Sequence, residues 1–203
     1  MLNNCNLQKI FETLIETYLT DNVGISEHFL SEVLSVKLKS NLLNLYDQNT
    51  LFTAGTGNEV DILKDTALRS DKIYWLDKSH HDPSENSFFD LMDEFVKYLN
   101  ETCYTGITGY EFHYAMYEKG SFYKRHLDRF RNDDSRLFSM ITYLNENWVE
   151  GDGGELSIFH NSGECQKINP TNCKSVFFKS DELEHEVLKT FVPRMSITGW
   201  LKR

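Results

Sequence analysis

Two side chains in the stretch FYKRHLD, His126 and Asp128, could bind one metal ion. Residues two positions apart on a β-strand point to the same face, so a strand here would present an imidazole beside a carboxylate. A third candidate, His185, begins the stretch HEVLK, which also has strand character. Two imidazoles and one carboxylate leave three positions of an octahedral ion open, which suits iron(II) oxygenases better than structural zinc. We therefore expect His126, Asp128 and His185 to hold iron(II).

The open positions need a co-substrate, and 2-oxoglutarate fits them. Its keto and adjacent carboxylate oxygens can chelate iron and leave one position for dioxygen, while its distal carboxylate needs a bidentate cation deep in the fold. Arg194 is the candidate for that cation. Taken singly, His185 between two glutamates could be a surface histidine, and Arg194 a surface arginine. The order and spacing of all four residues favour the iron site.

A second His-x-Asp tripeptide, from His80 to Asp82, shows how weak this motif is alone. It lies in the polar stretch SHHDPSEN, where Pro83 predicts a turn that would not hold two side chains rigidly on one face. The better interpretation is an exposed loop in which Asp82 starts a turn or caps the following helix.

Short strands are the elements predicted to position the metal ligands. After about residue 108, seven or eight apolar or alternating runs are separated by Gly, Asp and Asn, with no helical pattern between them. This pattern predicts antiparallel sheets that form a sandwich or jelly roll.

The front part is predicted to be mainly helical. Residues 72–76 (KIYWL) have strand character, and residues 53–70 have no sustained period, which predicts a long loop that acts as a lid over substrate. We expect one domain over 1–203, with residues 1–105 as helical support and 106–203 as the jelly-roll core. Helical spacing of apolar residues is found over 7–19, from an N-cap at Ser26 to Leu43, and over 88–99.

The net charge of −10 argues against a broad nucleic-acid surface, since phosphate binding needs clustered cations. The first residues lack the pattern of a signal peptide, and no stretch is apolar enough to span a membrane. We expect a cytoplasmic protein that binds neither nucleic acid nor membrane. A local basic patch is still compatible with the sequence at Lys124, Arg125, Arg129 and Arg131.

The cysteines follow no pairing pattern. Without a CxxC motif or paired spacing, they predict reduced thiols rather than a zinc cage or a disulfide framework. They are Cys5, Cys103, Cys165 and Cys173.

From about Arg69 to Trp200 the sequence resembles the prolyl hydroxylase branch of the 2-oxoglutarate and iron(II) dioxygenases. The matching stretches are RSDKIYWL, YEKGSFYKRHLD, SRLFSMITYLNENW, DGGELSIF and HEVLKTFVPRMSITGW. Arg194 stands where collagen-type enzymes have lysine, which places the chain nearer the oxygen-sensing animal enzymes and their bacterial relatives.

The resemblance implies a mainly β fold, a double-stranded β-helix (jelly roll) with supporting N-terminal helices and an iron site inside one open end. It implies a dioxygenase that uses iron(II), 2-oxoglutarate and dioxygen and releases succinate and carbon dioxide, and it allows for L-ascorbate.

Further roles come from the resemblance alone. On the co-substrate side, Tyr143 and Thr198 correspond to hydroxyls near the distal carboxylate, Tyr117 to a tyrosine at the chelating end, and Leu156 to a pocket wall. The group on the substrate side is Trp200, Tyr123, Arg136 and Arg69.

The expected substrate is a prolyl residue of a protein, converted to 4-hydroxyproline, with a translation factor as a candidate because of the bacterial relatives. Two alternatives stay open: a hydroxylase of a small molecule such as a free amino acid, and a non-catalytic jelly-roll binding protein. A zinc hydrolase is disfavoured because no general base is evident beside the three ligands. The sequence does not predict the oligomeric state.

Overall fold

The computed structural model describes residues 4–55, 67–128 and 135–203. Its helices are α1 (Asn4–Asp21), α2 (Glu32–Asp47), the short 3-10 helix η1 (Lys78–His80) and α3 (Pro83–Cys103). Its strands are β1 (Val23–Ser26), β2 (Phe52–Thr53), β3 (Lys72–Trp75), β4 (Gly109–Tyr117), β5 (Tyr123–His126), β6 (Arg136–Tyr143), β7 (Leu156–Phe159), β8 (Cys165–Ile168), β9 (Ser175–Lys179), β10 (Glu184–Val187) and β11 (Arg194–Lys202).

The strands form two antiparallel sheets that face each other. The seven-stranded major sheet has the order β1-β9-β6-β11-β4-β3-β2, and the four-stranded minor sheet has the order β5-β10-β7-β8. From β4 onward the chain repeatedly crosses between the sheets, with β4, β6, β9 and β11 in one and β5, β7, β8 and β10 in the other. This is the jelly roll expected from the sequence, and the prediction of a mainly β fold with N-terminal helices is confirmed.

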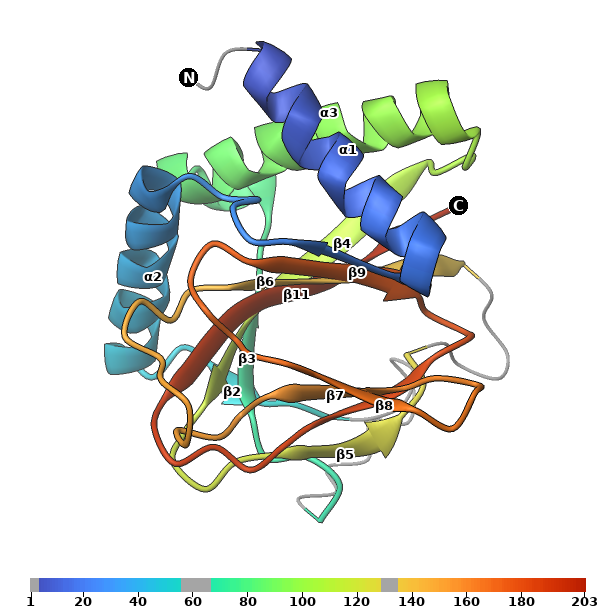
Figure 1. Ribbon diagram of the computed structural model, residues 1–203. Coiled ribbons are helices and arrows are strands. Elements are labelled where there is room, and N and C mark those ends of the chain that lie inside the picture. The colour runs from blue at the N-terminus through green and yellow to red at the C-terminus, as the bar shows by residue number, and fades with distance from the viewer. Residues whose placement is uncertain (1–3, 56–66, 129–134) are drawn as a thin grey trace.

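The helices cover the face of the major sheet that points away from the minor sheet (Figure 1). An aromatic-rich core fills this layer, with Phe29 on the helical side and Phe112 and Phe177 on the sheet, all at most 1% exposed. Helix α3 contributes Phe88, Met92, Phe95 and Leu99, at the three- and four-residue spacing of one helical face. The helical layer therefore supports the back of the major sheet and leaves its inner face free for a site.

The predicted start of the second helix was wrong. Ser26 ends strand β1, which pairs with β9, and α2 begins only at Glu32 after the N-cap Ser31, whose hydroxyl accepts from the Leu34 amide. Val33, one of the apolar residues in the helical spacing from Ser26 to Leu43, is 68% exposed. Residues 23–26 form a strand because they pair with the distant strand β9. The spacing of apolar residues in a short segment gives no sign of such a pairing.

The front part also contributes strands to the major sheet. Strand β1 pairs with β9, and β3 pairs with β4 and β2, so the first 105 residues hold more than supporting helices. The central part of the predicted lid (56–66) and the basic residues Arg129 and Arg131 lie outside the described residues. The lid stays a prediction.

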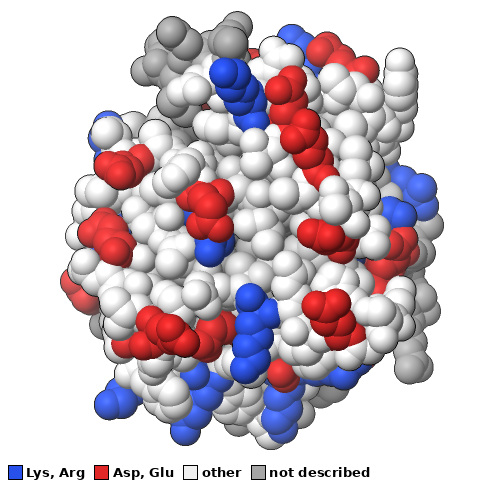
Figure 2. Space-filling model, viewed as in Figure 1, with Lys and Arg blue, Asp and Glu red and all other residues white. Residues whose placement is uncertain are grey.

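Acidic and basic side chains are interspersed over the face shown in Figure 2, where acidic groups are prominent. Among the described residues, no helix is both long and apolar enough to cross a membrane. The cysteines whose side chains are described, Cys103, Cys165 and Cys173, are free thiols.

Candidate metal centre and co-substrate pocket

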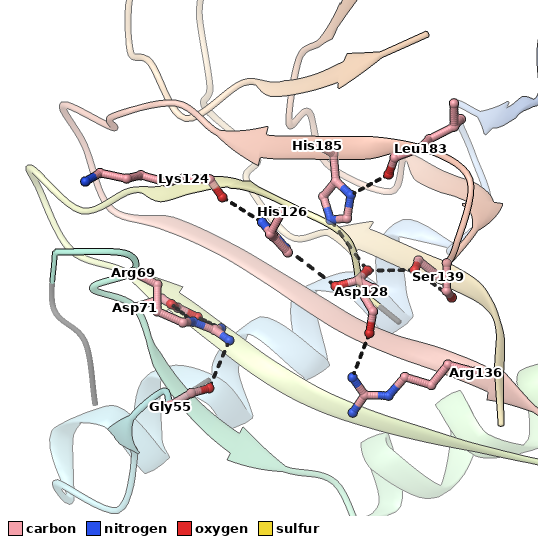
Figure 3. Close-up of polar contacts among 11 residues, drawn as sticks. Gly55, Arg69, Asp71, Lys124, His126, Asp128, Arg136, Ser139, Leu183 and His185 are labelled. Atoms are coloured by element: carbon pink, nitrogen blue, oxygen red, sulfur yellow. Dashed lines mark hydrogen bonds and ion pairs between the residues drawn. The ribbon is translucent and has the colours of Figure 1, made fainter. Parts of the chain in front are cut away.

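The three predicted metal ligands meet between neighbouring strands of the minor sheet. His126 ends β5 and lies directly opposite His185 on β10, and Asp128 follows two residues after His126. Asp128 Oδ1 lies 3.5 Å from His126 Nε2, and Asp128 Oδ2 lies 3.5 Å from His185 Nε2 (Figure 3). Within the described part of the chain, this is the one group of three side chains placed to hold a metal ion.

Hydrogen bonds fix the orientation of both imidazoles. His126 Nδ1 lies 2.7 Å from the Lys124 carbonyl oxygen, and His185 Nδ1 lies 3.2 Å from that of Leu183. A carbonyl oxygen only accepts, so each Nδ1 carries the proton and each Nε2 presents a lone pair toward Asp128. Both rings are thus set in the tautomer that binds metal.

The carboxylate of Asp128 is kept ionised. Burial on its own would raise the pKa of Asp128, but at acid pH the protonated forms of His185 and His126, with a hydrogen bond from Ser139, outweigh burial and hold that pKa well below its usual range. Ser139 Oγ donates to Asp128 Oδ2 at 2.6 Å. Burial lowers the pKa of His185 to about 4 despite Asp128, so this imidazole is neutral.

A stack of side chains supports His126 from the opposite side. The Tyr123 ring lies parallel to the His126 ring at 3.6 Å, and the Arg69 guanidinium lies 4.2 Å from the Tyr123 centroid. Arg69 donates from Nε and from a terminal nitrogen to Asp71 at 2.8 and 2.6 Å, and Asp71 is fully buried. The structure therefore places Arg69 in a buried ion pair behind a metal ligand.

The residues expected to bind the co-substrate lie on the inner face of the major sheet. Arg194 begins β11, is 1% exposed and lies opposite Tyr117 on β4. Its guanidinium carbon lies 4.8 Å from the Tyr117 ring and 5.0 Å from the Tyr143 ring. Arg194 Nε donates to the Gly154 carbonyl, whereas one terminal nitrogen of Arg194 and the hydroxyl of Tyr143 are buried without a partner.

An anionic ligand would satisfy these two unpaired groups. Unpaired buried polar groups are rare and costly in folded proteins, and a guanidinium is suited to a carboxylate. Burial raises the pKa of Tyr143, so its hydroxyl keeps the proton that it would donate. The donor set fits a carboxylate of 2-oxoglutarate, and the His-Asp-His set fits iron(II).

The other residues expected at this end are Thr198 and Leu156. Thr198 Oγ1 lies 3.2 Å from Ser196 Oγ, and Leu156 on β7 is fully buried in the core between the sheets. Gly154, at φ +76°, passes so close to Arg194 that an added Cβ would lie 3.0 Å from Arg194 Cδ. Glycine at this position therefore lets the chain approach the arginine.

At the other end of β11, Trp200 and Arg136 pack against each other. The guanidinium carbon of Arg136 lies 3.4 Å from the Trp200 centroid, Arg136 donates to Glu111 at 2.9 and 3.1 Å, and it also reaches the Asp128 carbonyl at 3.2 Å. Of the residues expected on the substrate side, Tyr123 and Arg136 therefore contact metal ligands directly, while Arg69 packs against Tyr123 and Trp200 against Arg136.

The second His-x-Asp tripeptide forms no such centre. Asp82 is the N-cap of α3 and accepts from the Ser84 and Glu85 amides at 2.8 and 2.9 Å, as its sequence context suggested. His80 lies 3.0 Å from Glu85 instead.

Sequence reasoning missed several residues that support the site: Asp71, Ser139, Glu111, Gly154 and His113. For His113 and Asp71 the sequence contains a signal that could have identified them. His113 lies four residues before Tyr117 on a strand and so shares its face, and Asp71 lies two residues after Arg69. Nothing local marks Ser139, which reaches Asp128 only through the packing of β6 against the end of β5.

Comparisons with known proteins agree with this geometry. Residues 112–202 match the family model of the 2OG-Fe(II) oxygenase superfamily. A Pseudomonas putida prolyl-4-hydroxylase structure has a TM-score of 0.85 and 32% identity, over 95% of this chain and 98% of that chain. A Trichoplax adhaerens prolyl hydroxylase, solved with a hypoxia inducible factor peptide fragment, has a TM-score of 0.85 and 25% identity, over 98% of this chain and 93% of that one.

Among curated relatives, human Egl nine homolog 1 is 27% identical over 96% of this chain, which spans 47% of the longer human protein. Similarity in sequence and fold, together with the His126, Asp128 and His185 cluster, is sufficient to assign the chain to a family. It belongs to the 2-oxoglutarate and iron(II) oxygenase superfamily, in the prolyl hydroxylase branch.

Proposed function

We propose that this protein is a 2-oxoglutarate-dependent dioxygenase that hydroxylates a prolyl residue of a protein, with a translation factor as a candidate target. One observation carries the proposal: the chain combines the His126, Asp128 and His185 cluster with a buried, incompletely paired Arg194 and Tyr143. A structural metal site needs neither open positions nor a buried anion-binding arginine.

Iron(II) would supply the oxidising chemistry, in which dioxygen converts 2-oxoglutarate to succinate and carbon dioxide; one oxygen atom of the dioxygen enters succinate and the other is added to a substrate C–H. The chain's own residues would hold and orient the participants. His126, Asp128 and His185 would ligate the metal, Arg194 and Tyr143 would donate to the distal carboxylate, and Thr198 lies on the same sheet face as Arg194. Close packing of both sheets would exclude water from this region.

A prolyl substrate is supported by the relatives and by the aromatic character of the pocket's other end. The Trichoplax relative was solved with a peptide fragment of hypoxia inducible factor. In this chain Tyr123 stacks on the metal ligand His126, and Trp200 packs against Arg136, which reaches the Asp128 carbonyl. Aromatic side chains near the metal ligands suit the rigid apolar pyrrolidine ring.

The direct test is succinate formation by the purified protein with iron(II), 2-oxoglutarate and dioxygen, with and without proline-containing proteins from a cell extract. We expect turnover in the wild type and none in His126→Ala. Arg194→Ala should turn over only when the 2-oxoglutarate concentration is about 100-fold higher than the wild type needs, because a buried charged hydrogen bond to the co-substrate is lost. Arg125→Ala is a matched control, because Arg125 forms a half-exposed pair with Glu184.

Mass spectrometry of the extract proteins should then find a proline that has gained one oxygen atom. Hydroxylation of free proline with no modified protein would support the small-molecule alternative. Absence of both metal and 2-oxoglutarate binding would contradict the oxygenase proposal and favour a binding module.

A further inference from the structure

Four buried side-chain nitrogen or oxygen atoms lack a hydrogen-bond partner in the described part of the chain. They belong to Arg194, Tyr143, His113 and Trp200. Strand register puts all four on the same face of the major sheet: Arg194 and Trp200 are six residues apart on β11, while His113 pairs with Thr198, and Tyr143 pairs with Ser196. Incomplete pairing is thus confined to the face that bears the proposed active site.

The co-substrate carboxylate would pair with the unpaired atoms of Arg194 and Tyr143. The unpaired atoms of His113 and Trp200 are too far along the strand to bind the same carboxylate. His113 and Trp200 lie toward the opposite end of β11, with their rings in edge contact at 5.7 Å between centroids. His113 Nδ1 and Trp200 Nε1 are both buried, and their residues are 3% and 7% exposed. Leaving two such atoms unpaired is costly, so a ligand at this position has a reason to bind.

The surroundings favour a neutral ligand group. Burial and the nearby Arg69 lower the pKa of His113 to about 4, which keeps the imidazole neutral, and an indole is always neutral. Arg69 is already paired with Asp71, and Arg136 with Glu111. A buried carboxylate here would find no uncommitted cation among these neighbours, whereas an amide carbonyl needs only N–H donors.

We propose that Trp200 Nε1–H and His113 Nδ1–H donate together to the peptide carbonyl oxygen of the target residue. One carbonyl oxygen has two lone pairs and can accept from both donors. Building on the function proposed above, this subsite favours a residue within a peptide over a free amino acid, whose carboxylate would be buried without a counter-charge. His113 becomes a specificity-determining residue beside the aromatic wall.

Nuclear magnetic resonance on the 15N-labelled full chain, loaded with zinc(II) and 2-oxoglutarate, tests the subsite without turnover. The chain has three tryptophans, so three indole N–H signals are expected, and Trp200→Phe identifies one of them. N-acetyl-L-proline methylamide should shift the Trp200 signal. N-acetylpyrrolidine, which lacks the prolyl carbonyl, and free L-proline should bind more weakly and shift it less.

Variants separate hydrogen bonding from ring packing. Trp200→Phe and His113→Leu should each weaken methylamide binding by about threefold to tenfold, the loss expected for one hydrogen bond. His113→Asn places an N–H near the Nδ1 position and should recover most of the affinity. Trp75→Phe is the control, because that ring contacts both residues but its nitrogen is not among the unpaired buried atoms. Affinity for 2-oxoglutarate should stay within about twofold in every variant, which reports an intact fold.

An unmoved Trp200 signal, or equal binding of methylamide and N-acetylpyrrolidine, overturns the subsite. If succinate assays succeed while His113 and Trp200 variants bind and turn over like the wild type, only this inference fails. If the methylamide binds through Trp200 but no succinate forms, the subsite stands and the dioxygenase proposal fails.

Discussion

The chain contains two His-x-Asp tripeptides, which differ in burial, in secondary structure and in the contacts of their side chains. His126 and Asp128 lie at the end of a strand, largely buried, with His185 opposite on the neighbouring strand. His80 ends η1 and Asp82 precedes α3 at the surface, where Asp82 caps a helix and His80 pairs with Glu85. A metal centre requires a third ligand brought from a distant segment and a second layer that fixes each ring.

The largest effect should come from removing the carboxylate of the first tripeptide. Asp128→Ala deletes one of three ligands, so we expect metal affinity to fall by at least about 100-fold, more than for loss of a supporting hydrogen bond. Equilibrium dialysis with iron(II) under argon measures this. His80→Ala is the counterpart in the second tripeptide and should stay within about twofold; equal losses in the two variants would refute the assignment.

The support behind His126 should be the next most sensitive point. Asp71→Ala leaves Arg69 buried without its partner, and we expect the free energy of unfolding to fall by about 3 to 5 kcal/mol. Urea denaturation followed by circular dichroism measures the loss. The exposed pair of Lys78 and Asp93, near the second tripeptide, is the control, and Lys78→Ala should cost at most about 1 kcal/mol. Similar losses would mean that burial does not distinguish the two pairs.

A smaller effect is expected at Ser139, whose hydroxyl donates to Asp128. Ser139→Ala should weaken metal binding by about 10-fold, because the hydrogen bond that orients the ligand is lost while the ligand stays. Ser139→Thr keeps the hydroxyl and should lose less. Wild-type metal affinity in the alanine variant would show that strand packing alone positions Asp128.

The smallest effect concerns the capping role of the second tripeptide. Asp82→Ala should lower the free energy of unfolding by about 1 kcal/mol and leave metal affinity unchanged, because only the first turn of α3 loses its cap. Thermal denaturation and metal titration measure the two effects separately. Asp82→Asn keeps the capping oxygen and should be near wild type, and any loss of metal affinity in Asp82→Ala would break the distinction between the tripeptides.

Much of the fold could be predicted because its signals are periodic. The alternating runs after residue 108 correspond to strands β4 to β11, and apolar spacing over 88–99 lies within α3. The start of α2 was misplaced because residues 23–26 become a strand only by pairing with β9, about 150 positions later. Long-range pairing of this kind leaves little trace in a short window.

For the site, the candidate metal ligands and Arg194 could be identified from the sequence, because residue chemistry and alternation along strands are local properties. The folded structure was needed to show which tripeptide is joined by His185, that Arg69 is paired with Asp71, and that Ser139 donates to Asp128. It also brought the unpaired nitrogens of His113 and Trp200 into one place. These facts depend on contacts between segments far apart in the chain, and such contacts follow from strand order and packing rather than from any local pattern.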